Sequence, residues 1–133
     1  MKTAHKKVLL IIPSKIIARG IESVLSELGE FRVEGILSDI SHASEARLRN
    51  MDADVIIIDP AVYDYMSRMS GRARLAEYSG AAVVALRTIP MDDEQVKLYD
   101  GTISMYDDPV TIVRKLRESL ASHEETPESE GHD

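Results

Sequence analysis

One carboxylate, Asp59, stands out in this 133-residue chain as a side chain placed to do chemistry. It follows the uninterrupted apolar run of residues 55–58 and precedes Pro60. A short run without polar residues is typical of a central parallel strand that is covered on both faces. Because open α/β sheets bind their ligands at the carboxyl ends of the strands, we expect Asp59 at that edge. The run of residues 8–12 ends in Pro13 with no acid beside it, so Asp59 has no obvious carboxylate partner.

Other polar residues have simpler structural explanations. Asp107 and Asp108 form an acidic pair, but an aspartate directly before a proline, here Pro109, is typical of a helix N-cap rather than a metal ligand. The four histidines have no spacing that suits a zinc site or a catalytic triad: His5, His42, His123 and His132. The sequence therefore predicts no catalytic residue, no metal site and no cofactor.

The segment after the first apolar run does not suit a phosphate loop. Ser14 and Lys15 follow a predicted strand and precede a predicted helix, which is the correct context for such a loop. The glycines that allow close backbone approach to phosphate are absent there. A small flavodoxin-like nucleotide-binding enzyme is therefore a less favoured interpretation.

The composition and the charge distribution separate a body from a tail. The chain contains no cysteine, which excludes disulfides, thiolate zinc sites and cysteine nucleophiles. Residues 123–133 hold five acids and no Lys or Arg, a composition typical of a disordered tail or linker. Residues 1–122 carry 16 basic and 18 acidic side chains, so this part is nearly neutral and lacks the positive footprint of a nucleic-acid-binding domain. We therefore predict one domain over residues 1–122 and an acidic tail over 123–133.

The apolar run of residues 8–12 is too short for a signal-peptide core or a membrane span. We therefore predict a soluble, cytoplasmic protein.

Hydrophobic periodicity divides the chain into alternating strands and helices. The predicted strands are residues 8–12, 31–37, 55–58, 81–86 and 101–105. The predicted helices are residues 14–28, 41–50, 72–78, one beginning near Pro90, and one beginning at Asp108 and Pro109. Strands and helices that alternate with short connections form a parallel sheet with right-handed crossovers. The expected fold is α/β: a flavodoxin-like, doubly wound, five-stranded parallel sheet with helices on both faces.

Three segments also match a known pattern. Residues 7–21, with their Gly20-Ile21 pair, have the rhythm of a first strand and helix; residues 31–35 match a second strand; and residues 54–59 match a strand that ends in an aspartate. In these segments residues 6–122 resemble the receiver domain of bacterial response regulators. The resemblance is to the LuxR/NarL subgroup, whose receivers precede a helix-turn-helix domain. It implies that Asp59 occupies the phospho-acceptor position.

The resemblance fails at the positions that would hold a metal ion. The family carries an acidic pair after the first strand to bind Mg²⁺, and these places fall at Ile12 and Pro13. Mg²⁺ requires near-octahedral oxygen ligands, usually with one or two carboxylates among them. Asp59 would have to hold the metal with little more than backbone carbonyl groups, so we do not expect efficient phosphotransfer.

Two further family positions also differ. The family's Ser or Thr after the fourth strand aligns with Arg87, with Thr88 adjacent, and its Lys after the fifth strand aligns with Met105 or Tyr106. We hypothesise that Arg87 forms a fixed ion pair with Asp59 in place of the metal-dependent switch. The alternative is that Arg87 points to solvent and Asp59 caps a loop.

These observations predict an atypical receiver, or pseudo-receiver, rather than an enzyme. It would be a regulatory and dimerisation module of a two-component-type transcriptional regulator, most simply a homodimer, acting without Mg²⁺-dependent phosphorylation. Its partners would be a sensor kinase or another regulatory protein, and it would reach DNA only through an output domain outside this chain. The alternative is a working receiver that is phosphorylated on Asp59.

Overall fold

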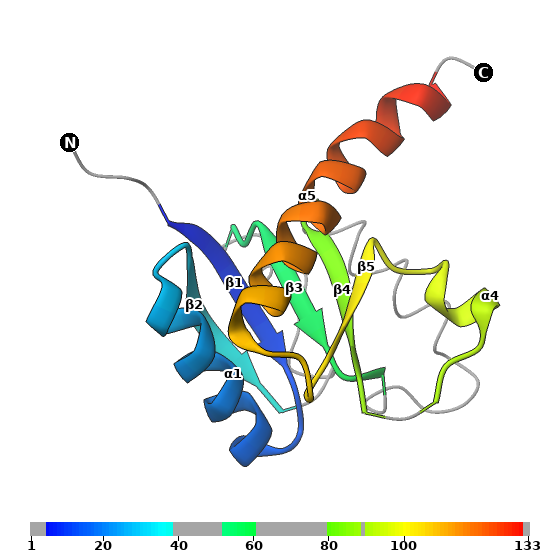
Figure 1. Cartoon of the computed structure of the whole chain (residues 1–133). Coiled ribbons are helices and arrows are strands. Elements are labelled where there is room, and N and C mark those ends of the chain that lie inside the picture. The colour runs from blue at the N-terminus through cyan, green and yellow to red at the C-terminus, as the bar shows by residue number, and fades with distance from the viewer. Residues whose placement is uncertain (1–4, 39–51, 61–79, 89, 132–133) are drawn as a thin grey trace.

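The structure is a computed structural model that describes residues 5–38, 52–60, 80–88 and 90–131. Five parallel strands form one sheet in the order β2-β1-β3-β4-β5 (Figure 1). The strands are β1 (Lys6–Ile11), β2 (Phe31–Leu37), β3 (Val55–Ile58), β4 (Ala82–Arg87) and β5 (Gly101–Ser104). The described helices are α1 (Lys15–Leu28), α4 (Asp93–Val96) and α5 (Pro109–Gly131). This strand order is that of a flavodoxin-like, doubly wound sheet, so the predicted fold class is confirmed.

The central strand β3 fixes the register of the sheet. Its Ile57 lies beside Leu10 of β1 on one side and Val84 of β4 on the other. Because all five strands run in the same direction, their carboxyl ends share one edge. The last residues of β1, β3 and β4 therefore bring the segments that follow them close together.

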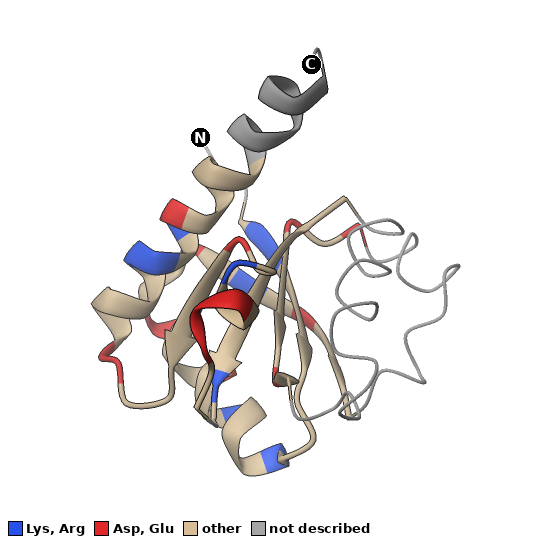
Figure 2. Cartoon of the chain, turned by 90° about the vertical axis from the view of Figure 1, so that its right-hand side faces the viewer, with Lys and Arg blue, Asp and Glu red and all other residues tan. Residues whose placement is uncertain are grey.

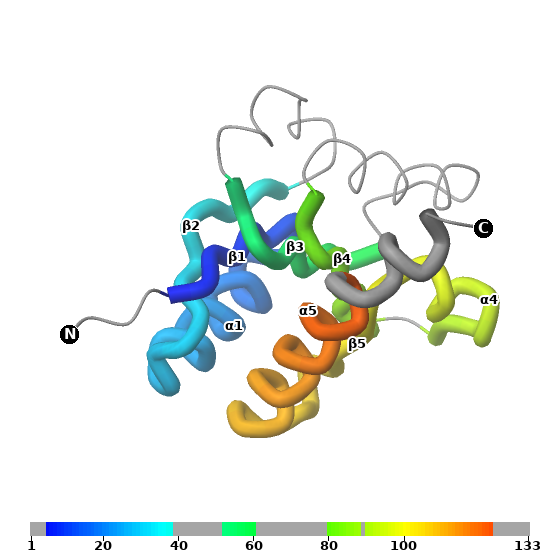
Figure 3. The backbone as a smooth tube through the Cα atoms, turned by 90° about the horizontal axis from the view of Figure 1, so that it is seen from above, coloured from blue at the N-terminus to red at the C-terminus, as the bar shows by residue number. Residues whose placement is uncertain are grey.

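Both faces of the sheet are buried, as the uninterrupted apolar runs predict. Alternate residues such as Leu10 and Ile57 pack with α1 and α5, which lie on the same side of the sheet (Figure 3). The intervening residues, such as Ile56 and Ile58, belong to a second apolar cluster on the opposite face, which Met91 and Leu98 also contact. The sheet is therefore the middle layer of the core.

The predicted boundaries of α1 are confirmed by its caps. The Ser14 Oγ accepts a hydrogen bond from the Ile17 N–H at 3.3 Å, which satisfies one free donor of the first turn. Gly29 ends the helix with φ +76°, a conformation that suits glycine, and its N–H donates to the Leu25 carbonyl. Ser14 and Gly29 thus delimit the helix that packs against the sheet.

The predicted starts of the last two helices are also confirmed. Asp92 caps α4 and forms a reciprocal capping box with Gln95. The acidic first turn of α4 lies on the side of the molecule that faces the viewer in Figure 2. Asp108 precedes α5, and its Oδ1 accepts a hydrogen bond from the Thr111 N–H at 2.8 Å. Asp108 therefore acts as the predicted N-cap, with Pro109 at the first helical position.

The helices predicted over residues 41–50 and 72–78 lie outside the residues that the structure describes. The backbone of α5 continues to Gly131 and so runs through most of residues 123–133, the predicted acidic disordered tail or linker. The tail was predicted from acidic residues such as Glu124 and Glu125. Glutamate also has a high helix propensity, which agrees with the helical backbone at these two residues. Among the described helices, none combines the length and the apolar character needed to cross a bilayer.

Candidate functional site

Asp59 lies at the carboxyl edge of the sheet, as predicted. It directly follows β3, and its N–H donates to the Ile11 carbonyl at the end of β1 at 3.0 Å. Only 6% of the residue is exposed, although aspartate is rarely so deeply buried without partners. The backbone of two neighbouring strands therefore fixes where this carboxylate stands.

Among the described residues, Thr88 has a side chain that contacts Asp59. Its Oγ1 donates to the Asp59 Oδ1 at 2.8 Å. Thr88 follows the last residue of β4, where the chain bends and the Thr88 N–H donates to the Leu86 carbonyl at 3.0 Å. A hydrogen bond to a carboxylate is charge-assisted and helps to offset the cost of burying Asp59. The sequence interpretation noted Thr88 only as the neighbour of Arg87, so it missed the residue that this geometry favours.

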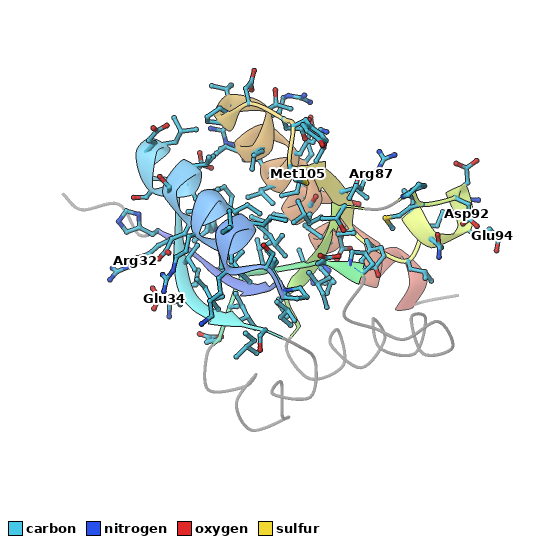
Figure 4. All side chains as sticks on the ribbon, turned by 90° about the horizontal axis from the view of Figure 1, so that it is seen from below. Arg32, Glu34, Arg87, Asp92, Glu94 and Met105 are labelled. Atoms are coloured by element: carbon cyan, nitrogen blue, oxygen red, sulfur yellow. The ribbon has the colours of Figure 1, made fainter. Side chains whose placement is uncertain are left out.

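Arg87 is the last residue of β4, and its side chain is exposed (Figure 4). The described part of the chain contains no ion pair between Arg87 and Asp59. Successive residues of an extended chain point to opposite sides. A shift of one position, from Arg87 to Thr88, therefore decides whether a side chain is directed at Asp59. In this structure the hydroxyl of Thr88, rather than the guanidinium of Arg87, binds the carboxylate.

The two positions that align with the family's acidic pair offer no side-chain oxygen. Ile12 is buried in the apolar core beside α1 and α5, with 1% of its surface exposed. Its N–H donates to the Leu37 carbonyl at 2.9 Å, and Pro13 is exposed. Among the described residues, no three His, Asp or Glu side chains lie close enough together to hold a metal ion. These residues do not fit the acid-rich Mg²⁺ site that the resemblance implies.

The segment after β5 also lacks the expected cation. Met105 and Tyr106 follow the strand, and their exposed fractions are 44% and 88%. The nearby Lys115 is bound instead to Asp107, with 2.8 Å between Nζ and Oδ2. Burial opposes ionisation of Asp107, but hydrogen bonds from Lys115 and from the Ser104 N–H outweigh it and hold the pKa of Asp107 below its ordinary value. Asp107 therefore ties this loop to α5.

Comparison with known proteins identifies the fold. No protein-family model matches the sequence, and no curated protein matches it. The receiver domain of a modulated diguanylate cyclase from Desulfovibrio desulfuricans G20 is similar with a TM-score of 0.75 and 17% identity, over 91% of this chain and 98% of that one. The receiver domain of the putative response regulator NarL from Mycobacterium tuberculosis is similar with a TM-score of 0.74 and 16% identity, over 90% and 98%.

A LuxR-family response regulator from Aurantimonas sp. SI85-9A1 is also similar, with a TM-score of 0.73 and 15% identity, over 89% of this chain and 86% of that one. The chain therefore has the fold of response-regulator receiver domains. NarL-type and LuxR-type receivers are among the structures that share it, in agreement with the subgroup that the sequence resembles.

Proposed function

We propose that this chain is an atypical receiver domain of a two-component-type transcriptional regulator. It would act as a regulatory and dimerisation module without Mg²⁺-dependent phosphorylation. The observation that carries the proposal is the edge around Asp59: the fold and the acid are those of a receiver, but Ile12 and Pro13 stand where metal-binding acids are needed.

The physical basis is charge neutralisation. Phosphoryl transfer to a carboxylate brings negative groups together, and catalysis depends almost wholly on positioning and on cations that offset this charge. Ile12 is buried among apolar side chains, so it cannot be replaced by a hydrated metal ligand without disturbing the core. Met105 adds no positive charge from β5. The hydrogen bond from the Thr88 hydroxyl to Asp59 is a contact that needs no metal ion.

A regulatory module without this chemistry would work through protein contacts. Apolar side chains are exposed on both helices of one face: Ile16 and Leu28 of α1 and Val110 of α5, the last with 68% of its surface exposed. Leu28 and Val110 line a groove between the two helices. Such residues support self-association as a homodimer or binding to a regulatory protein.

The proposed organisation places the module over residues 1–122 in the cytoplasm. Contact with DNA would be made by an output domain outside this chain, since residues 1–122 are nearly neutral and lack the net positive charge typical of a nucleic-acid-binding domain. The similarity of this fold to a LuxR-family response regulator and to the receiver domain of a NarL regulator supports this arrangement.

A second candidate is a working receiver that accepts phosphate on Asp59. The observation in its favour is the Thr88 hydroxyl, which lies on the acceptor carboxylate at the end of β4. The two candidates predict opposite responses to a phosphodonor.

The deciding experiment treats the protein with Mg²⁺ and either acetyl phosphate or beryllofluoride. Intact-mass spectrometry and backbone amide shifts are followed together, with Asp59→Asn as the matched control. We expect no added phosphoryl group and no saturable shifts around Asp59. A phosphoryl adduct that the Asp59→Asn variant lacks would overturn the proposal and establish the second candidate. Light scattering on the same samples tests whether the chain is a dimer with and without Mg²⁺.

A further inference from the structure

At the opposite edge of the sheet from Asp59, His123 of α5 touches the starts of two strands. Its Nε2 lies 2.9 Å from the carbonyl oxygen of Gly80, which precedes β4. Its Nδ1 lies 3.3 Å from the Oδ2 of Asp100, which precedes β5. The His123 side chain is 26% exposed and the Asp100 side chain 10%, so the contact with Asp100 is largely shielded from water, whereas the contact with Gly80 is exposed. One imidazole ring thus joins α5 to two neighbouring strands.

Asp100 is itself fixed to the sheet. Its Oδ2 accepts the Val83 N–H at 2.8 Å, and its own N–H donates to the Val83 carbonyl at 2.8 Å. Its side chain is only 10% exposed. These bonds hold the carboxylate at the edge between β4 and β5, so His123 is attached to a point that the strands keep in place.

His123 stands where the apolar contacts of α5 end. The core-facing stripe of the helix consists of Ile112, Val113, Leu116 and, partly buried, Leu120. From residue 121 to the end of the chain there is no Val, Ile, Leu, Met, Phe or Tyr, and yet the helix continues to Gly131. Figure 1 shows this last part of α5 extending beyond the sheet. His123 is the last residue of α5 whose side chain the structure describes. Its contacts with Gly80 and Asp100 are therefore the last described contacts between α5 and the sheet.

The two contacts of His123 require different protonation of its ring. Both facing atoms are acceptors, one a carbonyl oxygen and the other a carboxylate oxygen. A neutral imidazole carries one N–H and can donate to only one of them, whereas the imidazolium carries two and can donate to both.

Among the described residues, charged groups from β5 and α5 lie near His123. Asp100 faces the ring from the start of β5, and the Gly80 carbonyl faces it from the start of β4. Along α5, Lys115 and Glu118 line the groove that also contains Asp100. Lys115 is bound to Asp107, and Asp100 is the described charged group that His123 contacts directly.

We propose that His123 is a protonation-dependent clamp that fastens the C-terminal part of α5 to the starts of β4 and β5. The imidazolium holds both acceptors, and loss of a proton releases one of them and loosens the helix where it leaves the sheet. The clamp itself does not depend on the proposed function. If an output domain follows α5, which does rest on that function, the clamp sets how firmly the connecting helix is oriented.

The test is residue-resolved amide hydrogen exchange over residues 118–126, expressed as protection factors at pH 6 and pH 8. Histidine is the side chain whose charge ordinarily changes in this interval. In the wild-type protein we expect protection of these amides to be roughly 2- to 10-fold higher at pH 6, the equilibrium factor of about one net hydrogen bond. His123→Gln has one donor group in a similar place and should show the same protection at both pH values.

His5→Ala is the matched control, because His5 also binds a glycine carbonyl, that of Gly29, but does so away from α5. This variant should keep the wild-type pH response, and amides of β1 and β3 report that each variant is folded. Equal protection at both pH values in the wild-type protein, or a pH response that survives in His123→Gln, would overturn the clamp. Neither result depends on whether Asp59 accepts phosphate, so this test and that of the proposed function can fail separately.

Discussion

Gly101 of β5 and Ser119 of α5 are packed so tightly that one methyl group added at Gly101 should destabilise the protein. A Cβ added at Gly101 would overlap the Ser119 Oγ and lie 3.1 Å from the Ser119 Cβ. Ser119 is 2% exposed, and its hydroxyl donates to the Lys115 carbonyl at 2.8 Å. Rotating the hydroxyl away would break this bond and leave the Cβ contact unrelieved. Gly101→Ala therefore forces a small movement of α5 relative to the sheet.

The expected cost combines two opposing effects. Overpacking a well-packed site destabilises by about 1–3 kcal/mol. Replacing glycine by alanine also restricts the unfolded chain, which stabilises by about 0.4–1 kcal/mol. We therefore expect Gly101→Ala to lower the free energy of unfolding by about 1.3 kcal/mol, the difference between the midpoints of these two ranges, about 2 and about 0.7 kcal/mol.

A double-mutant cycle with Ser119→Ala separates this contact from other effects of the substitution. The Ser119→Ala change removes the overlapping oxygen and costs about 0.5–1.5 kcal/mol for its hydrogen bond. In that background Gly101→Ala should cost less, with a coupling energy of about 1 kcal/mol measured by urea unfolding of all four proteins. Part of the cost should remain, because the Cβ of residue 119 stays close. Additive effects within about 0.5 kcal/mol would show that the two residues are not in conflict and would refute this reasoning.

Three substitutions test other contacts. Glu30 and Arg117 join the end of α1 to α5, and the hydrogen bonds from Arg117 lower the pKa of Glu30. This contribution to stability is therefore present above the pKa of unfolded glutamate and is lost as the pH falls through the folded value. Arg117→Gln should remove this contribution. Urea unfolding midpoints at pH 7 and pH 3 should therefore differ less in the variant than in the wild-type protein. Thr88→Val should cost about 1–3 kcal/mol in urea unfolding, because it leaves the buried Asp59 oxygen without this donor. Arg87→Ala should change stability by less than about 0.5 kcal/mol, since its side chain is exposed; a larger loss or an altered oligomeric state by light scattering would restore the Asp59–Arg87 pair expected from the sequence.

Much of the described fold could be predicted because its signals are local. The bounds of β2 and β3 match the predicted residues 31–37 and 55–58. Ser14 and Gly29 mark the ends of α1 by their own hydrogen-bonding and backbone preferences, which act over a single helical turn.

The candidate site was less predictable because it depends on where one strand ends. The sequence predicted β4 to end at Leu86, which assigned the next position to Arg87. In the structure the strand includes Arg87, and the bend comes at Thr88. A boundary error of one residue is ordinary for strand ends, but here it exchanges a guanidinium for a hydroxyl beside Asp59.

Contacts between distant residues gave no signal at all. Glu30 and Arg117 are 87 positions apart, and Gly80 and His123 are 43 apart. Periodicity predicts which face of a helix is buried, but not which polar residue meets a given carbonyl or carboxylate. For this reason the contacts of His123 with Gly80 and Asp100 could not be predicted from the sequence, in which this residue begins the predicted acidic tail or linker.

The two edges of the sheet use aspartate in opposite ways. At the amino edge, Asp54 and Asp100 each precede a strand and each form a reciprocal pair with a backbone residue of the neighbouring strand. The Asp54 Oδ2 accepts the Lys7 N–H at 2.8 Å while its N–H donates to the Lys7 carbonyl, and Asp100 repeats the arrangement with Val83. These two carboxylates fix the register of neighbouring strands, and this structural role accounts for their positions without a catalytic one. At the carboxyl edge, Asp59 is held by a threonine hydroxyl and has a buried isoleucine where a metal-binding acid would be required. The fold therefore places Asp59 through the backbone of β1 and holds its carboxylate with the Thr88 hydroxyl, a hydrogen bond that needs no metal ion.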